Sequence, residues 1–286
     1  MKVLKDLFYG IKITIKKMTN KIKLIAEIGW NHMGNIQLAE KMIKAAANSG
    51  ADICKFQTWS EKDLKPGPWD TDGRREIYKK AQLSNEQHIE LKDYCSTKNI
   101  IFLTSIFNKK DLNFLSELNP DMIKIPSHEI YNIELISLAL ENFKKVLIST
   151  GASKWFEIEN IIKLNSKKII LMHCVSTYPC EPKLVNFPRM EKIKKYSTVF
   201  GYSGHLSGIE DAMIALVKGA SYVEKHFTID KNLPGRDNKF AILPNDLKKL
   251  SNFRDQIKEM NIDNGLDLQE CEKDIFNNYR GRWSKN

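Results

Sequence analysis

Two histidines, His205 and His226, each follow an apolar run that is typical of a β-strand. If the two runs are neighbouring parallel strands, both imidazoles reach the same end of the sheet. They could then hold one divalent metal and leave positions open for water and substrate. The alternative is that each histidine is only hydrogen-bonded in a polar rim, because two histidines alone do not define a metal site.

Two lysines, Lys55 and Lys124, stand among apolar residues of other runs, where an unpaired ammonium would be costly to bury. Together with nearby serines they predict a pocket for a small anion that carries phosphate and carboxylate groups. The serines of this pocket would be Ser127, Ser149 and Ser203. The alternative is a set of buried ion pairs with Glu27, Glu129 or Glu224.

Two further carboxylates stand at the ends of such runs or in the turns that follow them. Glu27 ends the first run and could act as a general acid or base, or could balance the lysines. Asp237 lies in a turn after Pro234 and Gly235, so it is either an acceptor for ligand hydroxyls or a turn former.

Eight short apolar runs alternate with helical patterns, and this order predicts a parallel (β/α)8 TIM barrel rather than an open doubly wound sheet. Polar residues gather at the carboxyl end of nearly every run, and in a barrel these ends meet at one mouth. The runs cover residues 23–29, 51–58, 100–105, 122–127, 146–151, 168–174, 198–203 and 221–227.

Three intervening segments have distinct patterns. Residues 35–50 predict a helix, because Ala39, Met42, Ile43 and Ala46 follow the spacing of one buried face, with Asn35 as N-cap and Gly50 as stop. Residues 246–260 predict the last helix. Residues 60–83, which are rich in charge, proline and glycine, predict a long loop that could be a lid over the mouth.

The composition excludes several classes of protein. The 286 residues are 42% hydrophobic and 28% charged, which is typical of a globular fold. We expect no membrane span and a cytoplasmic protein, because no apolar run is long enough for a bilayer, no signal peptide is visible, and the five cysteines form no CxxC pair.

The formal net charge of +10 is concentrated near the N-terminus, where seven lysines and one aspartate occur before residue 24. We therefore expect residues 1–22 to be a basic extension with a strand pattern that covers one end of the barrel, and residues 23–286 to be the barrel domain. We expect no nucleic-acid binding, because that needs a basic surface on the folded body.

Several motifs closely resemble those of the sialic acid synthases, which condense phosphoenolpyruvate with a hexosamine to give a nine-carbon 2-keto sugar acid. They occur in the family's order over nearly everything from residue 23 onward. The motifs are AEIGWNHMGN (26–35), GADICKFQT (50–58), KIPSHE (124–129), ISTGAS (148–153), LMHCVSTYP (171–179), GYSGH (201–205), EKHFTIDKNLPGRD (224–237) and NNYRGRWS (277–284).

The resemblance implies roles for the candidate residues. Glu27, His205 and His226 would be catalytic, and the two histidines would bind a divalent metal, usually manganese, with magnesium or cobalt as alternatives. The residues implied to hold phosphoenolpyruvate are Lys55, Ser105, Lys124, Ser127, Ser149, Ser176 and Ser203. The acceptor sugar would face Gln57, Tyr178 and Asp237 as well as Glu27. A homodimer is implied too.

The sequence departs from the family pattern at two positions, Gly204 and His128, where the family commonly has aspartate and glycine. We expect the loss of a carboxylate at 204 to remove a partner of the metal site. We also expect a barrel without the family's C-terminal antifreeze-like domain. The alternatives are condensation with another aldose or a phosphorylated sugar, as in octulosonate and heptulosonate synthases, or a non-catalytic sugar-binding barrel.

Overall fold

Eight parallel strands close into a barrel in sequence order in the computed structural model, which describes residues 22–197 and 199–283. All eight predicted runs form strands, so the predicted (β/α)8 barrel is confirmed. The strands are β1 (Lys23–Glu27), β2 (Ile53–Thr58), β3 (Ile101–Ile106), β4 (Ile123–Ile125), β5 (Val146–Ser149), β6 (Ile169–Cys174), β7 (Phe200–Gly204) and β8 (Tyr222–His226). The barrel closes where β1 pairs with β8.

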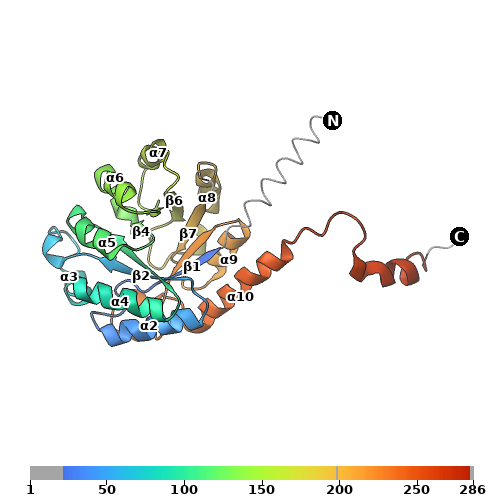
Figure 1. Cartoon of the computed structure of the whole chain (residues 1–286), viewed down its shortest axis with the longest axis horizontal. Coiled ribbons are helices and arrows are strands. Elements are labelled where there is room, and N and C mark those ends of the chain that lie inside the picture. The colour runs from blue at the N-terminus through green and yellow to red at the C-terminus, as the bar shows by residue number, and fades with distance from the viewer. Residues whose placement is uncertain (1–21, 198, 284–286) are drawn as a thin grey trace.

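Helices surround the strands on the outside of the barrel (Figure 1). They are α2 (Ile36–Asn48), α3 (Arg74–Ala81), α4 (Asn85–Thr97), α5 (Leu112–Leu118), α6 (Ile133–Asn142), α7 (Trp155–Lys163), α8 (Phe187–Lys194), α9 (Glu210–Val217) and α10 (Pro244–Met260). Short helical turns also lie in several connections, among them η1 (Glu61–Asp63), η5 (Asp237–Lys239) and the last one, η7 (Ile275–Tyr279).

Helix α2 forms as its sequence predicts. Asn35 is its N-cap and accepts a hydrogen bond from the Leu38 amide, and the four residues of the predicted face are the buried ones. Gly50 follows in the left-handed region at φ 88°, where a side chain would also collide with Ser251. The helix α10 starts two residues before the predicted start, because Pro244 fits the first turn of a helix.

Two apolar layers hold the barrel together. The larger layer lies between strands and helices and contains Leu24, Ala26, Cys54 and Phe56. The smaller layer fills the barrel interior. Its buried members are Ile25, Ile53, Leu103, Met122, Leu147, Ile170, Met172 and Tyr222. Because side chains alternate along a strand, the residues two positions beyond these also face inward.

That alternation puts polar side chains in the next inward layer. Glu27 comes two positions after Ile25, Lys55 after Ile53, and the same offset relates other pairs. The remaining pairs are Leu103 and Ser105, Met122 and Lys124, Leu147 and Ser149, and Tyr222 and Glu224. All six polar residues are buried. The apolar layer therefore forms the floor of a polar site at the carboxyl ends of the strands.

The segment 60–83 is not the predicted long loop, because it contains η1 and α3. Tyr78 of α3 packs against Trp30 and Trp59, with ring centroids 5.1 and 5.4 Å apart. The sequence RREIYKKA favours a helix, but its many charged residues led to the prediction of a loop.

The predicted strand of the basic extension falls in residues 1–21, outside the described residues, so the boundary after residue 22 stays a prediction.

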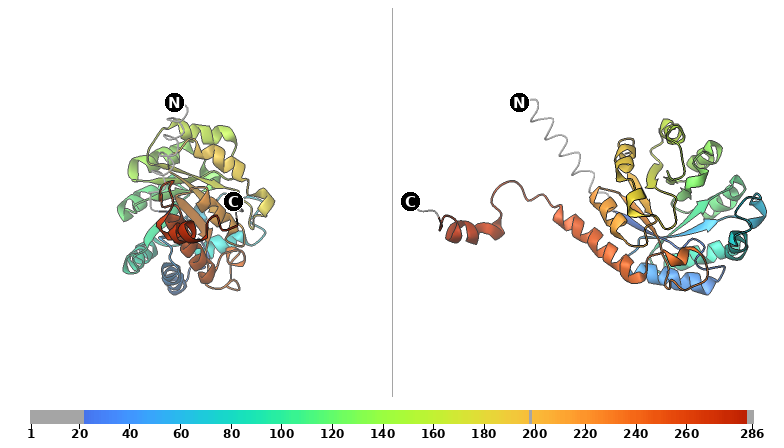
Figure 2. Two further views of the ribbon diagram at one scale, coloured as in Figure 1. Left: turned by 90° about the vertical axis from the view of Figure 1, so that its right-hand side faces the viewer. Right: turned by 180° about the vertical axis from the view of Figure 1, so that it is seen from behind.

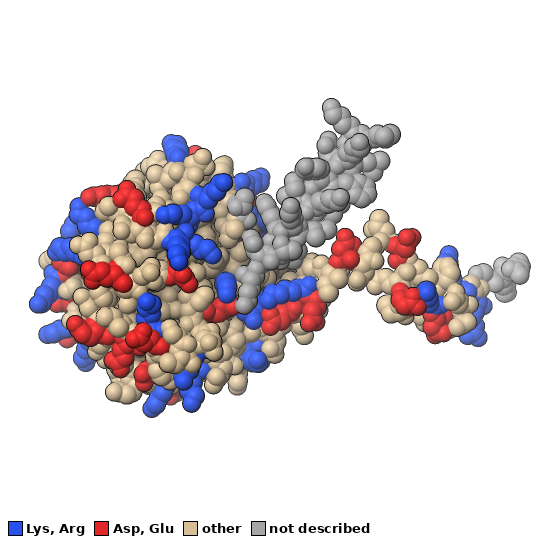
Figure 3. Space-filling model, viewed as in Figure 1, with Lys and Arg blue, Asp and Glu red and all other residues tan. Residues whose placement is uncertain are grey.

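The surface carries both signs of charge. Lysine and arginine side chains are interspersed with aspartate and glutamate over the face in Figure 3. Within the described residues, no helix is both long and apolar enough to cross a membrane. Residues 261–283 extend away from the barrel after α10 (Figure 2). Several large apolar side chains there are exposed, including Leu266 at 98% and Trp283 at 86%.

Replacing Leu103 by alanine tests the interior layer. Leu103 is fully buried inside the barrel, so Leu103→Ala should lower the free energy of unfolding by roughly 2–5 kcal/mol. Leu184→Ala is the matched control, because Leu184 is 40% exposed and should cost less than about 1 kcal/mol. Urea unfolding followed by circular dichroism measures both. Equal costs would contradict a packed interior.

Candidate active site

Four charged side chains meet above the apolar layer, and they come from strands β1, β2, β4 and β8. Lys55 Nζ lies 2.8 Å from Glu27 Oε2 and 3.6 Å from Glu224 Oε1. Lys124 reaches across the barrel from β4, and its Nζ lies 2.9 Å from Glu224 Oε2. The alternative of buried ion pairs is thus what the structure contains for both lysines, with Glu27 and Glu224 as partners and Glu129 outside the cluster. The anion pocket stays a prediction.

The pKa shifts follow from burial and from these pairs. Burial raises the pKa of Glu224, but Lys124 and Lys55 outweigh it and lower that pKa to about 2. Burial lowers the pKa of Lys55, but Glu224 and Glu27 outweigh it and raise that pKa. Glu27 differs, because burial and the neighbouring Glu224 raise its pKa against the opposing effect of Lys55. Glu27 is therefore the carboxylate of the cluster that takes a proton more readily.

Hydroxyl groups surround this cluster. Ser105 Oγ accepts a hydrogen bond from Lys55 Nζ at 3.0 Å, and Ser203 Oγ donates to Glu224 Oε1 at 3.1 Å. Ser149 is buried at the end of β5. The strands therefore bring together the serines that the sequence predicts at their ends.

Gly151 lets polar side chains lie close to the backbone beside the cluster. A Cβ on this glycine would lie 2.8 Å from Ser127 Oγ, 3.0 Å from Cys174 Sγ and closer still to Ser176 Oγ. The absence of a side chain therefore lets two hydroxyls and one thiol pack against Gly151. Such donors next to an ammonium suit the oxygens of a phosphate.

His205 and His226 lie side by side at the mouth, with ring centroids 5.5 Å apart. His205 donates its Nδ1 hydrogen to the Val175 carbonyl at 2.7 Å, which fixes the tautomer and leaves Nε2 as a free ligand atom. His226 Nδ1 is buried and has no hydrogen-bond partner among the described residues, although Asp237 Oδ2 is 3.3 Å away. Burial and the neighbouring His205 lower the pKa of His226 well below its ordinary value, which favours the neutral, ligating form.

The two imidazoles fit a metal held by two protein nitrogens. A backbone carbonyl behind a ligating histidine is a common supporting contact at metal sites. Among the described residues, no group of three or more histidine, cysteine or carboxylate side chains is arranged to hold a metal ion.

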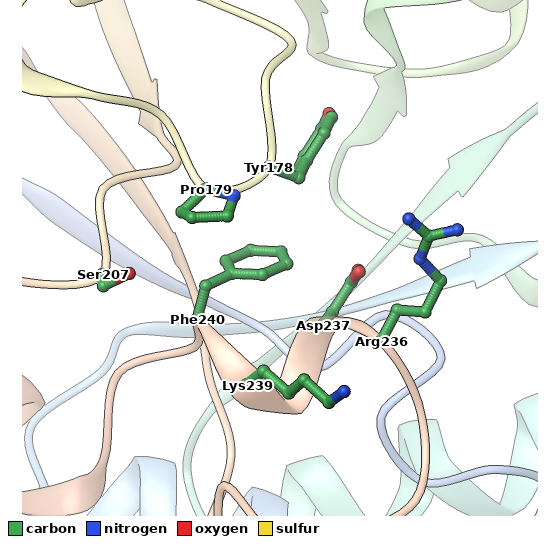
Figure 4. A pocket seen from close by; sticks show the side chains of 7 residues that line it. All are labelled: Tyr178, Pro179, Ser207, Arg236, Asp237, Lys239 and Phe240. Atoms are coloured by element: carbon green, nitrogen blue, oxygen red, sulfur yellow. The ribbon is translucent and has the colours of Figure 1, made fainter.

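A cavity of about 280 Å³ opens above the histidines. Its lining residues are Tyr178, Pro179, Ser207, Arg236, Asp237, Lys239 and Phe240 (Figure 4). The Tyr178 ring lies on His205 with centroids 4.2 Å apart, and the Phe240 ring lies 5.1 Å from His226. Burial and the neighbouring Glu27 raise the pKa of Asp237 to about 7. The cavity combines aromatic walls with a carboxyl group, as carbohydrate sites require.

Gln57 connects the cavity region to the inner cluster. Its Nε2 donates to Glu27 Oε1 at 2.6 Å, and both groups pack close to Gly29, where a Cβ would lie 3.1 Å from Glu27 Oε1 and 3.2 Å from Gln57 Nε2. All the residues that the sequence predicts for the site therefore lie in one connected region at the carboxyl ends of the strands. Their individual roles stay predictions.

Sequence reasoning missed two residues as members of the site. Glu224 was considered only as an ion-pair partner, yet it bridges both lysines. Its signal is an acidic residue in a buried strand two positions before His226. Nothing in the residue type of Cys174 or in its position in an apolar run indicates that it belongs to a functional site. Burial raises the pKa of its thiol, but His205, Ser127 and Lys124 outweigh that effect and lower the pKa to about 7.

The space beside Gly204 is occupied by another side chain. A Cβ at this position would collide with the carboxylate of Asp211 on α9 and lie 2.6 Å from the Tyr202 ring. Asp211 reaches this region from the following helix, and its carboxylate binds Tyr202 and Lys225. The expected loss of a metal-site partner at 204 stays a prediction.

A closed parallel barrel with its ionisable side chains and cavity at the carboxyl ends of the strands is the architecture of a barrel enzyme. The chain belongs to the NeuB family, whose sequence model matches residues 42–264.

Several named relatives of the chain are synthases of nonulosonic acids. The N,N'-diacetyllegionaminic acid synthase of Campylobacter jejuni is 35% identical over 257 residues, which cover 84% of this chain and 77% of that protein. The N-acetylneuraminate-9-phosphate synthase of Drosophila melanogaster is 33% identical and covers 82% of this chain and 68% of that protein. Among solved structures, the N-acetylneuraminic acid synthetase of Leptospira borgpetersenii, in complex with citrate, has a TM-score of 0.81 at 32% identity and covers 90% of each chain.

Breaking the inner cluster should be costly for stability. Lys55→Met leaves Glu27 buried without its nearest ammonium, so the free energy of unfolding should fall by roughly 3–5 kcal/mol. The matched control is Lys109→Met, because Lys109 pairs with Glu134 in an exposed ion pair and should cost no more than about 1 kcal/mol. Urea unfolding at neutral pH measures both, and a Lys55→Met variant as stable as the control would refute the paired cluster.

Proposed function

We propose that this chain condenses phosphoenolpyruvate with an N-acylated hexosamine, similar to N-acetylmannosamine, to give a sialic or related nonulosonic acid and phosphate. The main support for the proposal is that two sites lie one above the other at the carboxyl ends of the barrel strands. The lysines and the serines, two of which pack against Gly151, form the inner site, and the histidine pair with its cavity forms the outer one. The names of the relatives support the product class.

Phosphoenolpyruvate would occupy the inner site. Its carboxylate and phosphate would lie near Lys55 and Lys124, and the phosphate would accept hydrogen bonds from Ser127 and Ser176 beside Gly151. Both lysines are already paired with glutamates. The anion must therefore share the ammonium groups with Glu27 and Glu224, which orients it without a large excess of positive charge.

The acceptor sugar would enter the outer cavity in its open-chain form. Tyr178 and Phe240 would pack on its carbon skeleton, and Asp237 and Gln57 would bind hydroxyl or acyl groups. His205 and His226 would hold a divalent metal, with manganese as the first choice. When bound, such a metal supplies Lewis-acid polarisation of a carbonyl oxygen.

The chemistry forms one carbon–carbon bond and one carbon–oxygen bond and breaks one carbon–oxygen bond. The enol carbon C3 of phosphoenolpyruvate attacks the aldehyde carbon of the sugar, the aldehyde oxygen takes up a proton to become a hydroxyl, and positive charge develops at C2. Water adds to C2 and loses a proton, and phosphate then leaves with its bridging oxygen while the new C2 hydroxyl loses its proton to give the keto acid. Glu27 is the group suited to accept the proton of the water, because it lies in the inner cluster and has a raised pKa.

A phosphorylated acceptor is the second candidate. Arg236 and Lys239 both line the outer cavity and could bind a phosphate on the distal end of the sugar. The name of the Drosophila relative indicates that a relative makes a phosphorylated product.

We also propose a cytoplasmic homodimer. The five cysteines are free thiols, which suits a reducing compartment. The exposed apolar side chains of residues 261–283 would be covered by a second copy of the chain.

The first test is an acceptor screen. Purified protein is incubated with phosphoenolpyruvate and either N-acetylmannosamine, a 2,4-diacetamido hexose or a phosphorylated aldose, with and without manganese, and phosphate release is measured. We expect release with an N-acylated hexosamine, and at least about a tenfold loss for Arg236→Ala only if the preferred acceptor is phosphorylated. Release with none of these sugars would refute the proposal.

The second test concerns the metal. Manganese should raise the melting temperature of the native protein, and His205→Ala or His226→Ala should abolish that increase, because each removes a ligand nitrogen. The matched control is His128→Ala, because His128 is exposed and should keep the increase. Differential scanning fluorimetry with and without manganese makes the measurement. An increase retained in both histidine variants would contradict the ligand assignment.

A further inference from the structure

We propose that Asp211 and Lys225 are positioning residues for the histidine pair. Their buried ion pair holds the segment that follows His205 against the strand that carries His226. The inference rests on the proposed metal site, because it concerns how the two imidazoles are kept at the right separation.

One ammonium connects the two histidine segments. Lys225 directly precedes His226 on β8, and its Nζ donates to the carbonyl of Leu206, the residue after His205, at 2.8 Å. The same Nζ lies 3.0 and 3.1 Å from the two oxygens of Asp211. Lys225 and Asp211 are both buried. Without Asp211, the ammonium that binds Leu206 would be unpaired in the barrel wall.

The carboxylate of Asp211 is held in place by further donors. Tyr202 Oη donates to its Oδ2 at 2.9 Å, and the Ala212 amide donates to its Oδ1 at 2.8 Å. Tyr202 lies on β7, three residues before His205. The carboxylate is therefore fixed to β7, to α9 and through Lys225 to β8, so it cannot shift without moving one of them.

Gly204 contributes to this arrangement of Asp211 and Lys225. The carboxylate of Asp211 occupies the space that a side chain at 204 would fill. Glycine at this position therefore permits the aspartate on α9 to reach Lys225. A carboxylate introduced at 204 could take the same place only if Asp211 were removed.

A second, partly buried ion pair offers a control. Arg254 Nη1 lies 2.7 Å from Asp52 Oδ2, and Asp52 directly precedes β2, at the end of the barrel opposite the site. Both pairs join a helix to the strands, but the Arg254–Asp52 pair touches neither histidine segment. A general loss of stability should therefore follow from either pair, and a change at the histidines only from Asp211 and Lys225.

The experiment measures manganese affinity by electron paramagnetic resonance of the free ion. The double variant Lys225→Met/Asp211→Asn removes both charges and so avoids an unpaired buried charge, while it also removes the donor to the Leu206 carbonyl. We expect its dissociation constant to rise about tenfold or more. Asp52→Asn should lower the melting temperature but leave the affinity unchanged.

An exchange variant makes the test specific. Asp211→Ala should weaken manganese binding, and Gly204→Asp alone should weaken it too, because the new side chain collides with Asp211 and with the Tyr202 ring. The double variant Gly204→Asp/Asp211→Ala removes the collision with Asp211 and should regain part of the affinity, since a carboxylate again occupies the space beside Lys225. A double variant weaker than both single variants would contradict the exchange and with it the proposal.

A metal-free measurement separates this inference from the proposed function. Imidazole signals of 15N-histidine-labelled protein without metal should shift for His205 and His226 in Lys225→Met/Asp211→Asn but not in Asp52→Asn. If the native protein binds no manganese, the proposed metal site is wrong, and these signals still decide the positioning role. Unchanged signals together with unchanged affinity overturn the inference.

Discussion

Four charges lie inside the barrel, and the rest of the site depends on their mutual neutralisation. Lys55 and Lys124 supply two positive charges, and Glu27 and Glu224 supply two negative ones. An unpaired ion at this depth would destabilise the fold by several kcal/mol. The pairing therefore lets an otherwise apolar interior carry groups that can bind an anion, and it also fixes where these groups point.

The apolar floor beneath the charges is equally necessary. Six charged or hydroxyl groups of the inner site follow an interior apolar residue by two positions, as Glu27 follows Ile25 and Glu224 follows Tyr222. A shift of one residue in a strand would turn these groups toward the helices. The packed interior keeps the strand register, and the register keeps the ionisable groups in one layer. Core packing and site geometry are thus one constraint.

The amino-acid sequence predicts those parts of the structure that depend on local pattern. The eight strands, the cap and face of α2 and the gathering of polar groups at one mouth follow from periodicity and strand ends. The sequence does not predict which partner a buried charge chooses, because Glu129 and Glu224 look alike in sequence, whereas Glu224 is buried on β8 and Glu129 lies in the helical turn after β4. The helix α3 was missed because its charged residues resemble a loop, although Tyr78 packs on two tryptophans. Asp211 was missed because its contact with Gly204 crosses from a helix to a strand.

The inner and outer parts of the site differ in how firmly the fold determines them. The groups of the inner site lie mainly on strands whose register the core maintains. The outer cavity is formed by Tyr178, Arg236 and Phe240, which lie in the connections after β6 and β8. Connections tolerate substitution better than strands do. Substitutions in these connections can therefore change the shape and charge of the outer cavity without disturbing the buried charges. On the proposed function, the donor substrate is constrained by the barrel itself, whereas the acceptor is constrained only by loop side chains such as Arg236.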